Sequence, residues 1–64
     1  MNNNLKKYRK EKNLTQKQVA EQLGMQCEDR ISHWEKGQSV PSIQNLFKLC
    51  RIYSVDPREI YPEG

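Results

Sequence analysis

The stretch that decides the fold is residues 14–37, Leu-Thr-Gln-Lys-Gln-Val-Ala-Glu-Gln-Leu-Gly-Met-Gln-Cys-Glu-Asp-Arg-Ile-Ser-His-Trp-Glu-Lys-Gly. Apolar residues recur in it at helical spacing in two short segments, and each segment ends at a glycine. Glycine is common directly after a helix because it adopts positive φ without steric cost. The stretch therefore predicts two short helices separated by a tight turn.

The first of these helices is predicted to begin at Thr15. Thr15 and Gln18 have the spacing of a capping box, in which each side chain satisfies a free backbone N–H group of the first turn. Val19, Ala20 and Leu23 then share one face, where the small Ala20 allows a second helix to cross closely.

The second helix is predicted over about residues 28–36. Ile31 and Trp34 are three positions apart and should face the core. Glu28 and Asp29 lie in its first turn, where negative charge complements the helix dipole. Two short helices in this order form a helix-turn-helix, whose second helix enters the major groove of DNA.

A basic helix is predicted before this pair, over roughly residues 3–12. Leu5 and Tyr8 form its apolar stripe, and Asn13 is expected to end it. Residues 1–12 carry five Lys or Arg and one Glu, a net charge of +4, whereas the whole chain is +3. This basic end is compatible with a phosphate-facing surface, and an ordinary solvated helix face is the alternative.

Two more helices are predicted after the pair. Ser42 is the expected N-cap of a helix over residues 43–52, whose apolar face is formed by Ile43, Leu46, Phe47, Leu49 and Cys50. Asp56-Pro57 should start a final turn that packs Ile60 inward. The predicted architecture is all-α, with five short helices around one core in a single domain over residues 1–64.

The size of the chain limits what it can do. With 64 residues, it buries only about 60% of its unfolded surface, which argues against a deep catalytic cleft. It has one His, no Ser-His-Asp pattern and no phosphate loop, so no enzymatic activity is expected. No apolar stretch approaches the roughly 20 residues that span a bilayer, so a soluble, cytoplasmic protein without a membrane partner is expected.

The two cysteines, Cys27 and Cys50, are expected to be reduced because the chain shows no export signal. Cys50 lies in the apolar register of a helix and is interpreted as a small core residue. Cys27 and His33 are too few ligands for a tetrahedral zinc ion, so no metal and no cofactor are expected.

On these residues the chain resembles the Cro/phage-repressor-type helix-turn-helix DNA-binding domains, also called lambda-repressor-like or XRE family. The resemblance covers nearly the whole chain and depends on the joint order of Leu14-Thr15-Gln16, Val19-Ala20-Glu21, Leu23-Gly24, Ile31-Ser32, Trp34-Glu35-Lys36-Gly37, Pro41-Ser42, the helix from Leu46 to Cys50, and Val55-Asp56-Pro57. It implies a compact lambda-repressor-like fold and double-stranded DNA as the partner.

The resemblance also implies a division between residues that contact phosphates and residues that read bases. Phosphate contacts are expected at the start of the first helix of the pair and in the loop after the second, from Thr15, Gln16, Lys36, Gln38 and Ser39. With Ile31 and Trp34 facing inward, base contacts are expected from Arg30, His33, Glu28 and Asp29. Arg30 is the first choice because a guanidinium binds guanine O6 and N7 together, whereas Glu28 and Asp29 could simply complement the helix dipole.

Arg9 and Glu35 match a pair that forms an ion pair in the family, and two independent surface charges are the alternative.

The chain departs from the family pattern at two places. Gly24 and Ile31 are seven positions apart rather than six, which places one extra residue between Met25 and Arg30. Tyr53-Ser54 replaces the usual Leu-Gly pair, which suggests an altered connection after the fourth helix.

The leading functional hypothesis is a sequence-specific transcriptional regulator, expected to be a repressor, that binds an inverted repeat as a homodimer. The dimer is expected to use the region from Tyr53 to Tyr61. The alternative is an antitoxin of the same fold, which binds a toxin protein and regulates its own operon. A third reading is a structural helical domain that has lost DNA binding.

Overall fold

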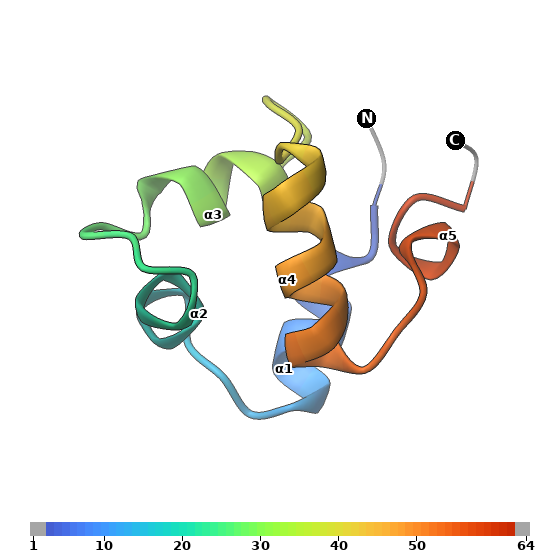
Figure 1. The fold of residues 1–64 in the computed structure, drawn as a ribbon, viewed down its shortest axis with the longest axis horizontal. Helices are drawn as coiled ribbons and strands as arrows, with labels where there is room; N and C mark the ends of the chain where they lie inside the picture. The colour runs from blue at the N-terminus through green and yellow to red at the C-terminus, as the bar shows by residue number, and fades with distance from the viewer. Residues whose placement is uncertain (1–2, 63–64) are drawn as a thin grey trace.

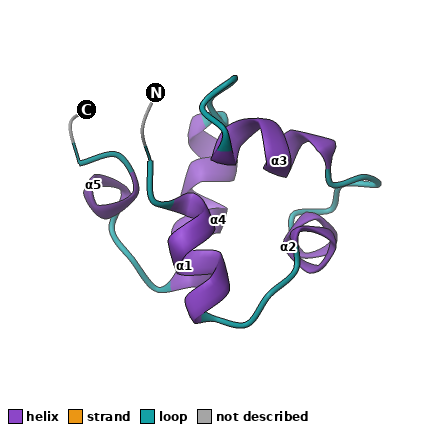
Figure 2. Cartoon of the chain, turned by 180° about the vertical axis from the view of Figure 1, so that it is seen from behind, coloured by secondary structure: helices purple, strands orange, loops and turns teal. Residues whose placement is uncertain are grey.

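The computed structural model describes residues 3–62, which form five α-helices and their connections without any strand (Figure 1). The helices are α1 (Leu5–Glu11), α2 (Gln16–Gln22), α3 (Asp29–Glu35), α4 (Ile43–Tyr53) and α5 (Pro57–Ile60). This confirms the predicted all-α, five-helix architecture. In both views α2 and α3 lie at one end of the long axis and α5 at the other, with α1 and α4 between them (Figures 1 and 2).

Four of the helices end in the same way, with one residue in the left-handed conformation. These residues are Asn13 (φ 58°), Gly24 (φ 78°), Gly37 (φ 77°) and Ser54 (φ 58°). The backbone N–H of the following residue then donates to a carbonyl five positions earlier, as Met25 does to Ala20 at 2.9 Å and Val55 to Cys50 at 3.0 Å. This satisfies carbonyls that the helix end would leave unpaired. Ser54 therefore makes the same turn as a glycine would, and no altered connection follows α4.

The starts of α2, α4 and α5 are capped by side chains as the sequence predicts. The Thr15 hydroxyl accepts from the Gln18 N–H at 3.0 Å, and the Gln18 carbonyl oxygen accepts from the Thr15 N–H at 2.8 Å. Ser42 caps α4, and Asp56 caps α5. These caps and the left-handed turns satisfy backbone groups at the helix ends, so the short helices begin and end at well-defined residues.

The core lies where the five helices meet. It consists of Leu5, Val19, Ala20, Leu23, Ile31, Trp34, Leu49, Cys50, Tyr53 and Ile60. Trp34 and Cys50 are therefore core residues, as predicted, while Cys27 is exposed and both cysteines are free.

The prediction for the apolar face of α4 was wrong at two positions. Ile43 is 71% exposed and Phe47 is 58% exposed, whereas Leu49 and Cys50 are buried. The inward stripe of α4 runs through Leu49, Cys50 and Tyr53 instead, and Phe47 lies beyond the arc of the helix that these three residues share. Ile43 and Phe47 are one helical turn apart and remain in solvent together.

Candidate nucleic-acid interface

The two helices of the predicted helix-turn-helix pack directly against each other, and α1 packs against α3. The inward side of α3 is anchored by Ile31, which is 1% exposed, and Trp34, which is 4% exposed. Both were predicted to face the core. Because this side is anchored, the opposite side of α3 is held in a defined orientation towards solvent.

That outward side carries the polar residues expected to read bases. Asp29, Arg30 and His33 are all exposed, and Lys36 follows them at the end of the helix. The side chains of Arg30 and His33 form no hydrogen bond or ion pair with other residues between 3 and 62. They are thus available to a ligand at the surface of α3.

The extra residue between Gly24 and Ile31 lies in the turn and not in the helix. The chain leaves α2 at Gly24, runs through residues 25–28, and starts α3 at Asp29. The predicted start at Glu28 was therefore one residue early. Glu28 is exposed at the N-cap position and its side chain makes no capping hydrogen bond, so its carboxylate is free of the helix end.

The predicted ion pair between Arg9 and Glu35 is confirmed. Arg9 Nε donates to Glu35 Oε2 at 2.7 Å and Arg9 Nη2 to Glu35 Oε1 at 3.3 Å, with side-chain exposures of 10% and 4%. Arg9 Nη1 also donates to the Leu14 carbonyl at 2.8 Å. A paired guanidinium and carboxylate with these additional bonds are compatible with burial, which a single charge would not be.

Gln16 completes this network, which the sequence did not predict. Its Nε2 atom donates to Glu35 Oε1 at 3.1 Å, so the Glu35 carboxylate joins α1, α2 and α3. The backbone N–H groups of Gln16 and Lys17 belong to the first turn of α2 and have no acceptor among residues 3–62. No sequence signal links positions 16 and 35, because the contact depends on how α2 crosses α3.

Tyr53 lies beside this network at the centre of the core. Burial raises the pKa of its phenol well above the ordinary value, the Glu35 carboxylate raises it further, and Arg9 opposes the shift. Its hydroxyl has no hydrogen-bond partner among the described protein groups. Tyr53 is therefore a neutral phenol whose pKa is influenced by both charges of the ion pair.

The loop after α3 presents the remaining residues expected to contact phosphates. Lys36, Gln38 and Ser39 are all exposed. The loop leaves α3 through the turn at Gly37, where the Gln38 N–H donates to the His33 carbonyl at 2.9 Å. Asn3 Nδ2 donates to the Trp34 carbonyl at 2.8 Å, which ties the start of the chain to the same helix end.

Within residues 3–62, no three His, Cys, Asp or Glu side chains are arranged so that they could hold a metal ion. No helix in that range is long and apolar enough to cross a membrane.

A helix-turn-helix family model matches residues 5–60. The chain belongs to this family of DNA-binding transcriptional regulators. It is 38% identical over 61 residues to the uncharacterized HTH-type transcriptional regulator MJ0272 of Methanocaldococcus jannaschii, covering 95% of this chain and 91% of that protein.

Two further similarities support the family and the fold. The chain is 39% identical over 59 residues to the HTH-type transcriptional activator BcrR of Enterococcus faecalis, which covers 92% of this chain but only 28% of that longer protein. The crystal structure of a proposed DNA-binding protein from Bacteroides fragilis superposes with a TM-score of 0.80 at 37% identity, covering 92% of this chain and 94% of that one.

Proposed function

We propose that this protein binds a specific double-stranded DNA sequence as a homodimer, with α3 in the major groove of each half-site, and represses transcription. The observation that carries the proposal is the two-sided character of α3. Ile31 and Trp34 anchor one side, while Arg30 and His33 are unpaired and exposed on the other. An exposed guanidinium on a fixed helix can bind guanine bidentately, and the other exposed candidates for base contacts are Glu28 and Asp29.

The proposed phosphate contacts flank α3 on two segments. The start of α2 offers the N–H groups of Gln16 and Lys17 together with the Thr15 and Gln16 side chains, and the loop after α3 offers Lys36, Gln38 and Ser39. Exposed N–H groups and a lysine suit phosphate oxygens. The bond from Gln16 to Glu35 supports this role because it fixes the start of α2 relative to α3.

Physical arguments support the proposed dimer and the proposed repression. One module of this size buries roughly 600–1,000 Å² on DNA, which gives limited specificity, and two symmetric copies double the number of bases read. Repression requires only that the bound protein occupies DNA needed by the transcription machinery, whereas activation requires a further productive contact.

The test is selection of binding sites from random duplexes of about 25 base pairs, carried out at two salt concentrations. The proposal expects an enriched inverted repeat with half-site centres roughly ten base pairs apart. Salt-sensitive retention without an enriched sequence would contradict specific recognition. A reporter gene downstream of the selected site should then lose expression when the protein is present, and increased expression would contradict repression.

A further inference from the structure

The positive charge of this molecule is concentrated on one segment of its surface. Five lysines between residues 6 and 17 are exposed and form no ion pair within residues 3–62. Glu11 is the only acid of this segment, and Arg9, its other cation, is buried in the pair with Glu35. The five lysines and Glu11 have a net charge of +4. This lysine patch consists of Lys6, Lys7 and Lys10 on α1, Lys12 directly after it, and Lys17 at the start of α2.

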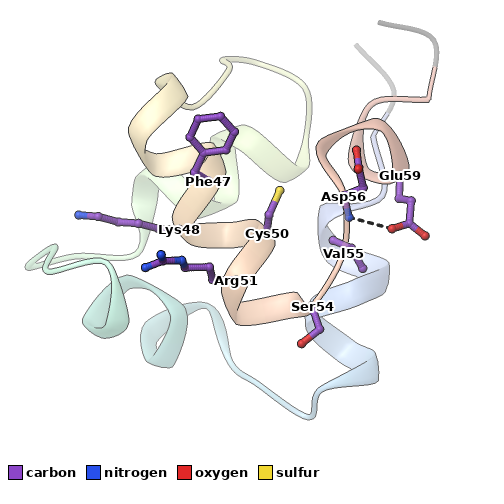
Figure 3. A pocket seen from close by; sticks show the side chains of 8 residues that line it. All are labelled: Phe47, Lys48, Cys50, Arg51, Ser54, Val55, Asp56 and Glu59. Carbon is purple, nitrogen blue, oxygen red and sulfur yellow. Dashed lines mark hydrogen bonds between the residues drawn. The ribbon is translucent and has the colours of Figure 1, made fainter.

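The rest of the described surface is electrically balanced. From residue 18 to residue 62, five exposed Lys or Arg side chains are matched by five exposed Asp or Glu side chains. At the pocket between α4 and α5, for example, Lys48 and Arg51 lie on one side of Cys50, and Asp56 and Glu59 lie on the other (Figure 3). The net charge of the described chain therefore comes from the lysine patch.

The segment proposed to read bases has no excess of positive charge. Residues 18–39 carry three exposed acids, Glu21, Glu28 and Asp29, against two exposed cations, Arg30 and Lys36. The sequence-independent affinity of a protein for DNA comes from Lys and Arg side chains that neutralise phosphates and release their counterions. A strong electrostatic contribution to DNA binding therefore requires cations from outside this segment.

The lysine patch adjoins the start of α2, where a phosphate contact is already proposed. Lys17 follows Gln16 directly, and Lys12 is three positions before Thr15, a stretch of at most about 10 Å. Each DNA strand carries one phosphate per roughly 3.4 Å of helix axis, so the phosphates next to the proposed contact come within this distance.

The loop that follows Lys12 is bonded to α1 and, through α1, to α3. The Lys12 N–H donates to the Tyr8 carbonyl at 3.2 Å, and the Leu14 N–H donates to the Arg9 carbonyl at 3.1 Å. Arg9 Nη1 donates to the Leu14 carbonyl at 2.8 Å, while Arg9 Nε and Nη2 donate to Glu35 of α3. The same arginine therefore fixes the lysine patch relative to the helix proposed to enter the groove.

We propose that the lysine patch binds the phosphates of the DNA that flanks each half-site, beyond the start of α2. Lys10, Lys12 and Lys17 contact these phosphates, and Lys6 and Lys7 add attraction at longer range. Base reading and electrostatic affinity then belong to two surfaces, α3 and the lysine patch. This inference rests on the proposed function and adds to it a contact outside the bases that are read.

The first experiment measures binding to a duplex with one selected half-site, so that pairing of two copies does not affect the result. A patch variant combines Lys10→Gln, Lys12→Gln and Lys17→Gln. It should bind at least about tenfold more weakly at low salt, and its slope of the logarithm of the binding constant against the logarithm of the salt concentration should fall by about two to three. Its preference among sequences should stay the same, because these lysines contact no bases.

A control variant removes the same charge elsewhere, by Lys48→Gln, Arg51→Gln and Arg58→Gln on α4 and α5. These cations have acids near them and no role in the proposed DNA contacts, so the slope should fall by less than about one. All six replaced side chains of the two variants are exposed, so both proteins should remain folded, and thermal unfolding checks this.

The second experiment places the contact on the DNA. The half-site duplex is extended on one side or on the other, and the flanking phosphates are then replaced by uncharged methylphosphonates. Wild type should bind more tightly with a flank on one side only, and uncharged linkages in that flank should remove the gain. The patch variant should gain little from either flank.

Three outcomes would overturn the inference and leave the proposed function intact. One is sequence-specific binding whose salt dependence is the same in wild type and the patch variant. Another is an equal loss in the control variant, which would indicate an effect of total charge. The third is an equal gain from both flanks. If wild type binds no duplex even at low salt, the proposed function and this inference are both refuted.

Discussion

The side chain of Gln16 at the start of α2 donates a hydrogen bond to Glu35 at the end of α3, with 3.1 Å between Nε2 and Oε1. The same carboxylate is paired with Arg9 of α1 and is 4% exposed. A single buried acidic group therefore sets how the helix expected to contact phosphates lies relative to the helix expected to read bases. Changes at this carboxylate should affect stability and DNA binding together.

Arg9→Ala should lower the free energy of unfolding by about 3–5 kcal/mol, because it leaves Glu35 buried without its cation. Domains of this length are stabilised by only roughly 3–10 kcal/mol, so the variant should be partly unfolded at 37 °C and bind DNA more weakly. The double variant Arg9→Met with Glu35→Gln should cost less than Arg9→Ala. Urea unfolding and DNA titration measure both effects, and unchanged melting and affinity would show that the pair has no structural role.

Arg30→Ala and Lys36→Ala should weaken DNA binding in different ways. Loss of the Arg30 guanidinium should cost about 1–3 kcal/mol on the selected site and relax the preference at one base pair. Loss of Lys36 should weaken binding similarly on all sequences. It should also reduce the slope of the logarithm of the binding constant against the logarithm of the salt concentration by about one. Titrations of the selected site and a scrambled duplex at several salt concentrations distinguish the two. An Arg30→Ala protein with unchanged sequence preference would exclude this residue from base reading.

Ser54→Gly should stabilise the protein. Ser54 is left-handed at φ 58°, a conformation that costs a residue with a Cβ roughly 1–2 kcal/mol. Removing that cost, less the greater freedom of glycine in the unfolded chain, should raise the melting temperature by several degrees for a domain of this size. Asn13→Gly at the equivalent turn of α1 is the comparison and should gain less, because asparagine tolerates this conformation better. A lower melting temperature for Ser54→Gly would be the contrary result.

Stability should fall in alkaline solution because of Tyr53. Burial raises the pKa of this phenol in the folded protein, so the stability linked to it is fully present below the ordinary tyrosine pKa of about 10 and is lost as the pH rises towards the folded value. Tyr53→Phe should reduce this loss and leave stability at pH 7 nearly unchanged, because the hydroxyl has no protein partner. Melting curves of both proteins between pH 8 and about 11 measure the difference, and parallel curves would contradict it.

The two cysteines should differ in reactivity. Burial raises the pKa of the Cys50 thiol, and the nearby Asp56 and Glu59 carboxylates raise it further, so the reactive thiolate is disfavoured. Cys27 is exposed in the turn between α2 and α3. In the folded protein an alkylating reagent should modify Cys27 rapidly and Cys50 slowly, whereas both should react in denaturant. Peptide mass spectrometry identifies the sites, and equal rates in the folded state would argue against the burial of Cys50.

Local signals allowed most of the fold to be predicted. The Thr15–Gln18 capping box, the left-handed Asn13 and the inward Ile31 and Trp34 each depend on neighbours within one or two helical turns, so their residue types and spacing predict them. The Arg9–Glu35 pair was found only through the family resemblance, because its partners are 26 positions apart.

What the sequence could not predict depends on how the helices are placed against one another. Ile43 and Phe47 have the spacing of core residues, but the packing of the helices leaves them 71% and 58% exposed. The bond from Gln16 to Glu35 likewise requires the crossing of α2 over α3. The extra residue after Gly24 could have entered the turn or the helix, and no local signal favoured the turn.

The bonds of Asn4 to the end of the chain have a consequence for the order of folding. Its backbone N–H donates to the Ile60 carbonyl at 3.0 Å, and its side chain donates to the Glu59 carbonyl at 2.8 Å, across 55 positions. Such a contact cannot form until the intervening helices have already brought the two ends together. We therefore expect the ends to close last during assembly, so that hydrogen exchange at the Asn4 amide reports when the whole domain, and not only its helix pair, has been formed.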